Sequence, residues 1–395
     1  MSISMQYEIK DILKNEDVAF VIGNGINRRF FSDVKSWMEL LESLWEKYGT
    51  NASNDWNSFY NNDEKKLEGI TLTELFDLIE MKCHCRTKSV RLFPGSNNQI
   101  GLKEFSPAEK KIVKEIAARC ITKSQVELTC EFATVAQDLK KKCREWCKEN
   151  IIDANLLTDV DCVIYMTELL SDNTKLQLYR NILKKEITKE YLKDKDDDTF
   201  NVFMKTMESR EAPVLTTNFD TYMSSSLGLT MFKMGNGFTD FYPWNVYFGK
   251  YVLDSPIDGF GIWHINGLVK YPRGIKLGLS DYMGCVERAR NMIHHHKNMN
   301  EFFDGKNRDN WVGYNTWLHI VFNKPLFIFG LALDENEVFL RWLLIQRAKF
   351  SKLYGQNLKG WYVDNYISKG KRVFLESLGF KIINTNYDEL YDAFL

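Results

Sequence analysis

Two glycines, Gly23 and Gly25, directly follow the apolar run 18–22. The run is typical of a buried strand with a layer packed on each face. The apolar spacing between residues 34 and 48 predicts a helix capped by Ser32 and Asp33. A strand, a glycine turn and a helix make a cradle for phosphate, because free N–H groups and the positive end of a helix dipole converge there. The alternative is an ordinary tight turn, since the third glycine of the dinucleotide fingerprint is missing.

Small or polar residues follow three later apolar runs as well. They stand in the segments Thr-Thr-Asn-Phe-Asp (216–220), Trp-His-Ile-Asn-Gly (263–267) and Gly-Leu-Ala-Leu-Asp-Glu (330–335). If the runs are parallel strands, their carboxyl ends meet at one edge of a sheet, which is where such sheets bind ligands. The sequence therefore predicts one site at that edge. The residues expected there from these segments are Asn218, Phe219, Asp220, His264, Asn266, Gly267 and the run from Gly330 to Glu335 that includes Asp334.

Each of these segments also has a structural interpretation. His264 belongs to an apolar run, where a histidine can be a core residue. Residues 218–220 can cap a helix, because Asn and Asp side chains accept hydrogen bonds from the N–H groups of a first turn. For Asp334 and Glu335 the helix cap is the favoured interpretation.

The whole chain predicts an α/β fold with a large insertion. Six apolar runs, near residues 18, 213, 261, 325, 360 and 380, alternate with helical patterns such as 335–350 and 367–378. This alternation is the signature of a doubly wound, Rossmann-like parallel sheet. Between Gly101 and Gly228 there is no glycine, which predicts helices, and residues 106–109 form a capping box. We expect an α/β domain built from residues 1–60 and 206–395, split by an all-helical insertion, 61–205, that ends in a flexible run at 193–198.

The composition bears on the class of function. The chain has 52 basic and 53 acidic residues, so nothing favours nucleic acid or an anionic membrane as the main partner. No secretory signal or bilayer-length apolar stretch is visible, and the eight cysteines suit reduced thiols, so we expect a cytoplasmic protein. The cysteine spacing of a zinc ribbon is missing, and the three histidines at 294–296 would point in different directions on a helix, so no metal is expected.

Three ordered motifs resemble the sirtuin-like NAD-binding family: Gly-Asn-Gly-Ile-Asn (23–27), Thr-Thr-Asn-Phe-Asp (216–220) and the His-x-x-Gly segment that begins at His264. The closer resemblance is to its bacterial anti-phage branch, which hydrolyses NAD, and it covers about residues 15–50 and 210–350. It implies a sirtuin-like fold, with NAD as the substrate and the NAD pyrophosphate held by the glycine loop. The residues that it assigns to NAD binding are Gly23, Asn24, Gly25, Ile26, Asn27, Thr217, Asn266, Gly330 and Asp334.

The resemblance also implies catalytic roles. Asn218 matches the asparagine that positions water near the nicotinamide ribose, and Asp220 matches the aspartate of the same motif. Where the family usually has a histidine directly before the glycine, this chain has Asn266, which cannot take up a proton at neutral pH but can hydrogen-bond a ribose hydroxyl. Either His264 reaches the ribose hydroxyls or the general base is lost, which typically costs about a hundred- to ten-thousand-fold in rate. Because the zinc module of protein-deacylating sirtuins is missing, water is favoured over acyl-lysine as the acceptor.

Three hypotheses of different classes follow. The first is an NAD hydrolase that forms ADP-ribose and nicotinamide and acts in anti-phage defence by depleting NAD. The second is a catalytically silent module of a defence complex that binds NAD or ADP-ribose, which Asn266 favours. The third is a scaffold that binds no nucleotide. By analogy with the family, the hydrolase is expected to be a homo-oligomer and to dock on a ring-shaped ATPase or helicase.

Overall fold

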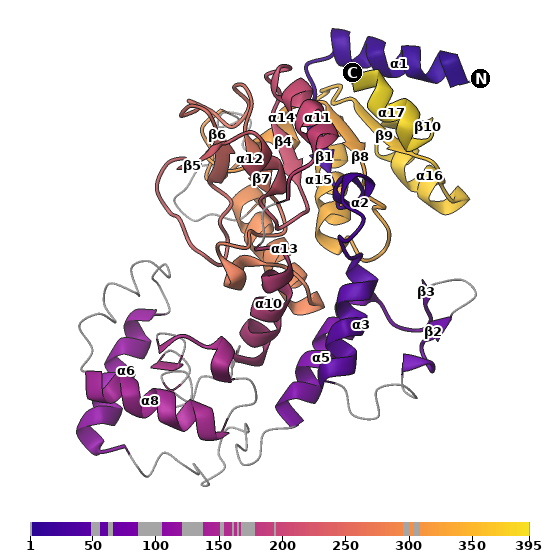
Figure 1. Ribbon diagram of the computed structural model, residues 1–395. Coiled ribbons are helices and arrows are strands. Elements are labelled where there is room, and N and C mark those ends of the chain that lie inside the picture. Colours follow the sequence, from indigo (N-terminus) through magenta and orange to yellow (C-terminus); the bar gives the residue numbers. More distant parts are fainter. Residues whose placement is uncertain are drawn as a thin grey trace.

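The computed structural model describes residues 2–48, 56–61, 66–85, 105–120, 137–150, 154–159, 162–163, 166, 178–192, 195–294, 301–303 and 309–394. Figure 1 shows a sheet-based body from which part of the helical insertion extends.

Six parallel strands form the body of an eight-stranded sheet, and all six were predicted from the apolar runs. The sheet order is β10-β9-β8-β1-β4-β7-β6-β5. With the parallel strands numbered along the chain, this is the order 6-5-4-1-2-3, which is compatible with a Rossmann-like doubly wound fold. The parallel strands are β1 (Ala19–Ile22), β4 (Val214–Thr216), β7 (Ile262–His264), β8 (Leu326–Phe329), β9 (Gly360–Asp364) and β10 (Phe380–Asn384).

Two antiparallel strands at one edge of the sheet were not predicted. They are β5 (Thr230–Lys233) and β6 (Val246–Gly249), and β6 pairs with β7. β5 is short and only partly buried, so it lacks the continuous apolar run that reveals a central strand. The loop between them contains Gly235 and Gly237, both at positive φ.

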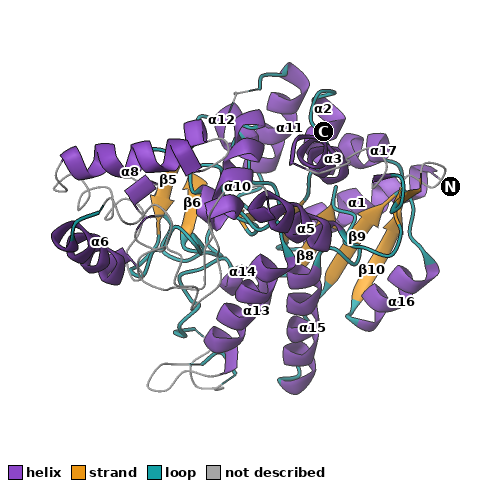
Figure 2. Cartoon of the chain, turned by 90° about the horizontal axis from the view of Figure 1, so that it is seen from below, coloured by secondary structure: helices purple, strands orange, loops and turns teal. Residues whose placement is uncertain are grey.

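Helices cover both faces of the sheet (Figure 2). Side chains of β1 alternate between two cores: Phe20 and Ile22 pack in one, Ala19 and Val21 in the other. The first face carries α1 (Ser2–Asn15), α2 (Gly25–Phe30), α11 (Asp198–Glu208), α12 (Tyr222–Ser226) and α17 (Tyr387–Phe394). The second face carries α13 (Leu279–His294), α14 (Leu318–Asn323), α15 (Val338–Leu353) and α16 (Lys369–Ser377).

The insertion is mostly helical in its described residues but is not all-helical, because β2 (Tyr60–Asn61) and β3 (Lys66–Leu67) form a small antiparallel pair. The end predicted for the insertion, residue 205, lies inside α11. The apolar side of α11 packs on the sheet, so the α/β body resumes at Asp198. In Figure 1, α6 and α8 lie far from the sheet, whereas α3, α5 and α10 lie below its edge. Their bounds are α3 (Trp37–Tyr48), α5 (Leu72–Cys85), α6 (Pro107–Cys120), α8 (Gln137–Asn150) and α10 (Leu178–Glu190), with short 3₁₀ turns at Ala154–Leu156 and Pro272–Gly274.

The cap predicted for the helix over residues 34–48 was wrong, whereas the capping box predicted at residues 106–109 is confirmed in α6. α3 begins at Trp37, and its box is Ser36 with Glu39: Glu39 Oε2 accepts from the Ser36 amide at 2.5 Å, and Ser36 Oγ accepts from the Glu39 amide at 3.2 Å. The short α2 occupies the chain just after the glycine loop instead. In α6, Ser106 and Glu109 make the same reciprocal bonds.

A buried ion network fastens the insertion to the α/β body. Arg180 and Lys184 of α10 both contact Asp281 of α13, at 3.2 and 3.0 Å, and Arg180 also pairs with Asp77 and Glu80 of α5. Burial lowers the pKa of Lys184 to about 8, although Asp281 opposes this shift. Burial alone would raise the pKa of Asp281, but the charges of Lys184 and Arg180 hold it well below its usual range.

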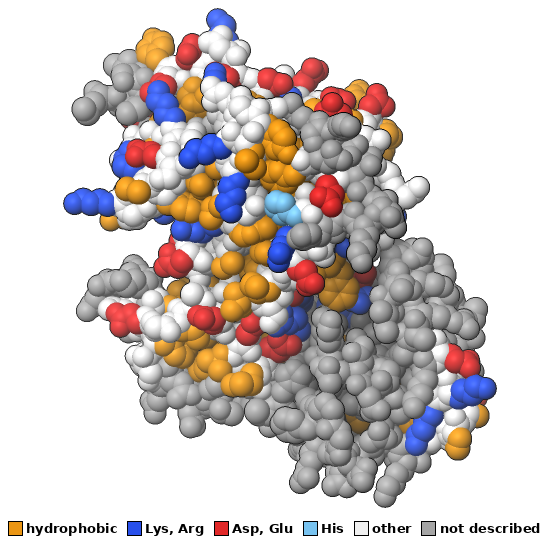
Figure 3. All heavy atoms as spheres, turned by 180° about the vertical axis from the view of Figure 1, so that it is seen from behind, with side chains coloured by type: hydrophobic (Ala, Val, Ile, Leu, Met, Phe, Trp, Pro, Cys, Tyr) orange, Lys and Arg blue, Asp and Glu red, His pale blue; other side chains and the backbone are white. Residues whose placement is uncertain are grey.

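The described helices include none with both the length and the apolar composition to cross a bilayer. On the face drawn in Figure 3, basic and acidic side chains are interspersed over the described surface rather than separated by sign. Residues 295 and 296 of the triple histidine lie outside the described residues.

Candidate functional site

The candidate site lies where the sheet order reverses, between β1 and β8. The loops that follow these two strands touch: the Gly25 amide donates to the Gly330 carbonyl at 2.8 Å. A Cβ atom on Gly23 would lie 2.6 Å from the same carbonyl oxygen, and one on Gly25 would lie 2.7 Å from it. The glycines are therefore required for the close approach of two loops. The Gly25 N–H is engaged by the Gly330 carbonyl and is therefore not one of the free N–H groups of the expected phosphate cradle.

A cavity of about 340 Å³ opens above these loops, and we call it the switch-point cavity. Its volume falls in the range of about 300–1,000 Å³ that is typical of small-molecule sites. Eight of the residues that the family resemblance assigns to the site line it: Asn24, Gly25, Thr217, Asn218, Asp220, Asn266, Gly330 and Asp334. The other four, Gly23, Ile26, Asn27 and His264, are not among its lining residues.

The four predicted residues outside the lining support those within it. Gly23 lies beneath Gly330, and Ile26 is fully buried in the core of the first sheet face. Asn27 is also fully buried, and its Nδ2 donates to Asp220 Oδ2 at 2.7 Å. These residues hold the shape of the glycine loop.

Asp220 accepts a hydrogen bond from the first residue of α12 and also lines the cavity. Its Oδ1 accepts from the Tyr222 amide at the start of α12, at 3.0 Å, and its Oδ2 accepts from Asn27. Burial raises the pKa of Asp220 to about 6, although these two hydrogen bonds oppose the shift. The structural interpretation of the 218–220 segment therefore applies to Asp220, whose two oxygens are both engaged.

His264 lies behind Asn218 rather than in the cavity. Its Nδ1 donates to the Asn218 carbonyl oxygen at 2.7 Å, and its Nε2 is buried without a partner among the described residues. Burial lowers the pKa of His264 to about 4, with the bond to Asn218 opposing, so the ring is neutral at neutral pH. The Asn218 side chain in turn donates to the Gly23 carbonyl, at 3.4 Å. The structure thus places His264 as a support for the Asn218 loop.

Asn266 enters the cavity from the turn that follows β7. Gly267 has a φ of +98°, and a Cβ atom there would lie 2.3 Å from the Gly274 carbonyl oxygen, so only glycine fits this turn. The Asn266 carbonyl accepts from the Lys276 amide at 2.8 Å. Lys276 also lines the cavity, is 3% exposed, and donates from Nζ to the Phe241 carbonyl at 2.8 Å.

Two carboxylates follow β8 at one end of the cavity. Asp334 Oδ1 accepts from both the backbone and the side chain of Asn336, at 2.9 and 3.0 Å, in the turn that leads into α15. Glu337 stands immediately before α15 and lines the cavity. Burial, and next the Asp334 carboxylate, raise the pKa of Glu337 to about 7, while a hydrogen bond with Asn266 lowers it. The helix-cap interpretation of Asp334 was wrong: Glu337 is the N-cap residue of α15, and Asp334 instead stabilises the preceding turn and lines the cavity.

A further carboxylate lines the cavity from β9. Asp364 Oδ2 accepts from the Tyr362 hydroxyl at 2.9 Å, and Oδ1 accepts from the Asn365 amide at 2.8 Å and the Tyr387 hydroxyl at 3.3 Å. Asp364 ends a strand and is therefore at the same edge as the predicted residues. Its position after an apolar run was a signal that could have found it.

Residues at the ends of α3, α5 and α10 cover one side of the cavity. Ser36 and Trp37 come from the start of α3, Leu72 and Thr73 from the start of α5, and Tyr191 from the end of α10. The Leu72 amide donates to Asn336 Oδ1 at 2.8 Å, and this hydrogen bond joins the start of α5 to the turn after β8. These residues carry no motif, since their helices are brought to the site by packing.

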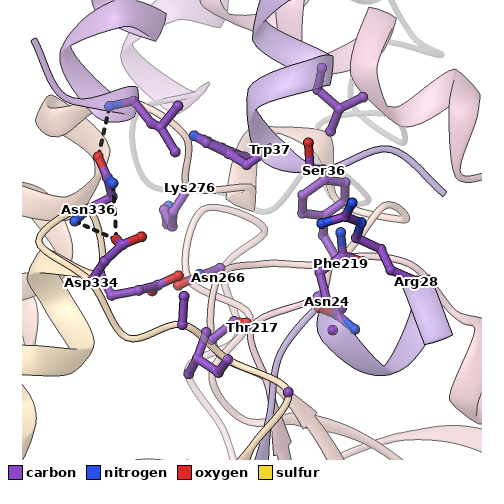
Figure 4. Close-up of a pocket in the computed structure, with 18 of the residues that line it drawn as sticks. Asn24, Arg28, Ser36, Trp37, Thr217, Phe219, Asn266, Lys276, Asp334 and Asn336 are labelled. Atoms are coloured by element: carbon purple, nitrogen blue, oxygen red, sulfur yellow. Dashed lines mark hydrogen bonds between the residues drawn. The ribbon is translucent and has the colours of Figure 1, made fainter. Parts of the chain in front are cut away.

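The cavity combines two cations with carboxylates, amides and aromatic rings. In Figure 4, Asp334 and Asn336 lie at one end of the view, Asn24 and Arg28 at the other, with Asn266 between them. Such a lining suits a ligand that has both hydroxyls and anionic groups. Among the described residues, no cluster of three or more His, Cys, Asp or Glu is arranged to hold a metal ion. The lining residues that the sequence did not indicate include Arg28, Lys276, Tyr282, Glu337 and Tyr387.

The sequence matches no protein-family model and no curated protein.

Proposed function

We propose that the protein is a sirtuin-like NAD hydrolase that cleaves NAD to ADP-ribose and nicotinamide in the switch-point cavity. One observation carries the proposal: residues from four separated segments, including Asn24, Asn218, Asn266 and Asp334, line one cavity at the reversal point of a doubly wound sheet. Ligands of open α/β sheets bind at such a point.

The lining has the parts that NAD cleavage requires. Nicotinamide is a good leaving group, and its departure leaves an oxocarbenium-like ribose, so catalysis needs a held conformation, a placed water and nearby negative charge. Asn218 is the candidate for placing water, and Asp220 for electrostatic support at a distance. Arg28, an exposed residue at the rim, is the candidate for the pyrophosphate.

The experiment is nicotinamide release from NAD by the purified protein, alone and with the product of a neighbouring gene. Asn218→Ala is the test variant, because its side chain lines the cavity. We expect release by the wild type and its loss in the variant. Equal release by both proteins would point to a contaminant and count against the proposal.

A second candidate is a silent module that binds NAD or ADP-ribose. The observation that favours it is that Asn266 holds the position expected for histidine, while His264 is buried behind Asn218. The module predicts a thermal shift with ADP-ribose and no release of nicotinamide under any condition. A scaffold predicts neither.

The biological setting that goes with hydrolysis is anti-phage defence through NAD depletion. It rests on the family resemblance, as do the homo-oligomer and the ring-shaped ATPase or helicase partner. Infection of cells that express wild type or Asn218→Ala tests it, since only the wild type should lower cellular NAD. Size-exclusion chromatography with light scattering tests the oligomer.

A further inference from the structure

Water attack on the ribose requires a proton acceptor, and this inference rests on the proposed function. As the oxygen of water bonds to carbon, it becomes acidic and must lose a proton. His264 does not line the cavity, and Asn266 carries an amide that cannot take up a proton at neutral pH. The acceptor must therefore be sought among the carboxylates of the cavity.

The oxygens of two cavity carboxylates are fully engaged by protein donors. Asp220 accepts from Tyr222 and Asn27, one bond to each oxygen. Asp364 accepts from Tyr362 on one oxygen and from Asn365 and Tyr387 on the other. Each of these groups is held as a structural acceptor.

Glu337 differs from them in having an unengaged oxygen. Its Oε2 is shielded from solvent and has no hydrogen-bond partner among the described residues, while the carboxylate also interacts with Asn266. A buried carboxylate oxygen without a hydrogen-bond donor destabilises the fold. Such an oxygen is available to accept a hydrogen bond or a proton from a water molecule during turnover. Asp334, the carboxylate whose charge acts on Glu337, accepts through Oδ1 from Asn336.

We propose that the Glu337 carboxylate accepts the proton of the water that attacks the ribose, with Asn266 orienting the carboxylate. The bond between C1′ and the nicotinamide nitrogen breaks, and its electron pair leaves with neutral nicotinamide. The water oxygen bonds to C1′, and one of its protons passes to Glu337 Oε2 and then to solvent. The chain thus supplies one general base, Glu337, and Asn266 serves as its positioning residue.

The charge environment of Glu337 agrees with this role. The titratable groups that face it are Asp334, from the turn after β8, and Tyr282, from α13. Lys276, which is labelled in Figure 4, lines the same cavity, and so do Asp220 and Asp364. With its pKa raised by burial to about 7, Glu337 both gains and loses a proton readily at neutral pH.

The test compares Glu337→Gln with Glu335→Gln, an exposed neighbour that does not line the cavity. Nicotinamide release is followed from pH 5.5 to 8.5, and ADP-ribose affinity is measured by calorimetry. We expect wild-type kcat to rise with an apparent pKa near 7. Glu337→Gln should lose about a hundred- to ten-thousand-fold in kcat and the pH step, and keep its ADP-ribose affinity. Glu335→Gln should behave as the wild type.

The outcomes separate this inference from the proposed function. If the wild type releases nicotinamide, Asn218→Ala does not, and Glu337→Gln keeps wild-type kcat and pH profile, the role of Glu337 is overturned while hydrolysis stands. If no condition gives release by the wild type, both are overturned. A second variant, Glu337→Asp, retains a carboxylate, so it should keep a pH step at reduced kcat even if Glu337→Gln folds poorly.

Discussion

The side chains of Asn27 and Asp220, 193 residues apart in the chain, meet beneath the switch-point cavity with Asn27 Nδ2 2.7 Å from Asp220 Oδ2. Both are almost fully buried. This contact joins the loop after β1 to the loop after β4. Asn24 of the first loop and Asn218 of the second therefore line the same cavity.

Asn27→Ala is expected to destabilise the fold by about 1–3 kcal/mol, because Asp220 Oδ2 loses its donor while it stays buried. The measurement is urea unfolding at pH 7.5. Asn15→Ala is the matched control: Asn15 makes a similar bond to Asp11, but on the surface, so its loss should cost at most about 0.5 kcal/mol.

Gly25→Ala should destabilise by about 1–3 kcal/mol, because the added Cβ would lie 2.7 Å from the Gly330 carbonyl oxygen and must push two loops apart. Gly370→Ala, in α16, meets no atom within 4 Å and should be neutral or stabilising. Thermal unfolding compares the two. Equal stability of both variants would mean that the loops separate at no cost.

Asp281→Asn should destabilise by about 3–5 kcal/mol, because Lys184 and Arg180 then lose a buried charge partner. The exposed pair of Arg372 with Glu376 provides the control, since Arg372→Ala should cost at most about 1 kcal/mol. Denaturant unfolding gives both values. A small effect of Asp281→Asn would show that the network does not hold the insertion to the body.

His264→Asn tests a pH dependence whose sign follows from burial. The pKa of His264 is lowered to about 4, so between about pH 6.5 and 4 the imidazole binds a proton in the unfolded state but not in the folded state. The free energy of unfolding of the wild type should therefore decrease as the pH is lowered through this window, by up to about 3 kcal/mol relative to the variant. Asp220 contributes to the pH dependence of stability with the opposite sign, because its pKa is raised. Both proteins contain Asp220, so its contribution cancels in the difference between them.

Arg28→Ala should weaken ADP-ribose binding about tenfold or more, if the cavity binds the pyrophosphate through this guanidinium. Arg29→Ala is the matched control, because Arg29 pairs with Asp388 and does not line the cavity. Calorimetry at two salt concentrations measures both affinities. Similar affinities for the two variants would place the phosphates elsewhere.

Local pattern was sufficient for the strands and for the residues that directly follow them. Apolar runs revealed the six parallel strands because a strand buried on both faces is apolar throughout. They did not reveal β5, which is half exposed at the sheet edge. The cap of α3 was misplaced because Ser32 and Ser36 are both good cap residues, and only the structure shows that α2 occupies the chain before residue 31.

The sequence by itself determined that small and polar residues end the strands of a parallel sheet, because strand periodicity and turn chemistry are local properties. Tertiary structure alone decided that Gly25 touches Gly330, that His264 lies behind Asn218, and that Glu337 Oε2 is buried without a partner among the described residues. Strand order, burial and the packing of α3, α5 and α10 set these contacts. They join residues far apart in the chain, so no local pattern encodes them.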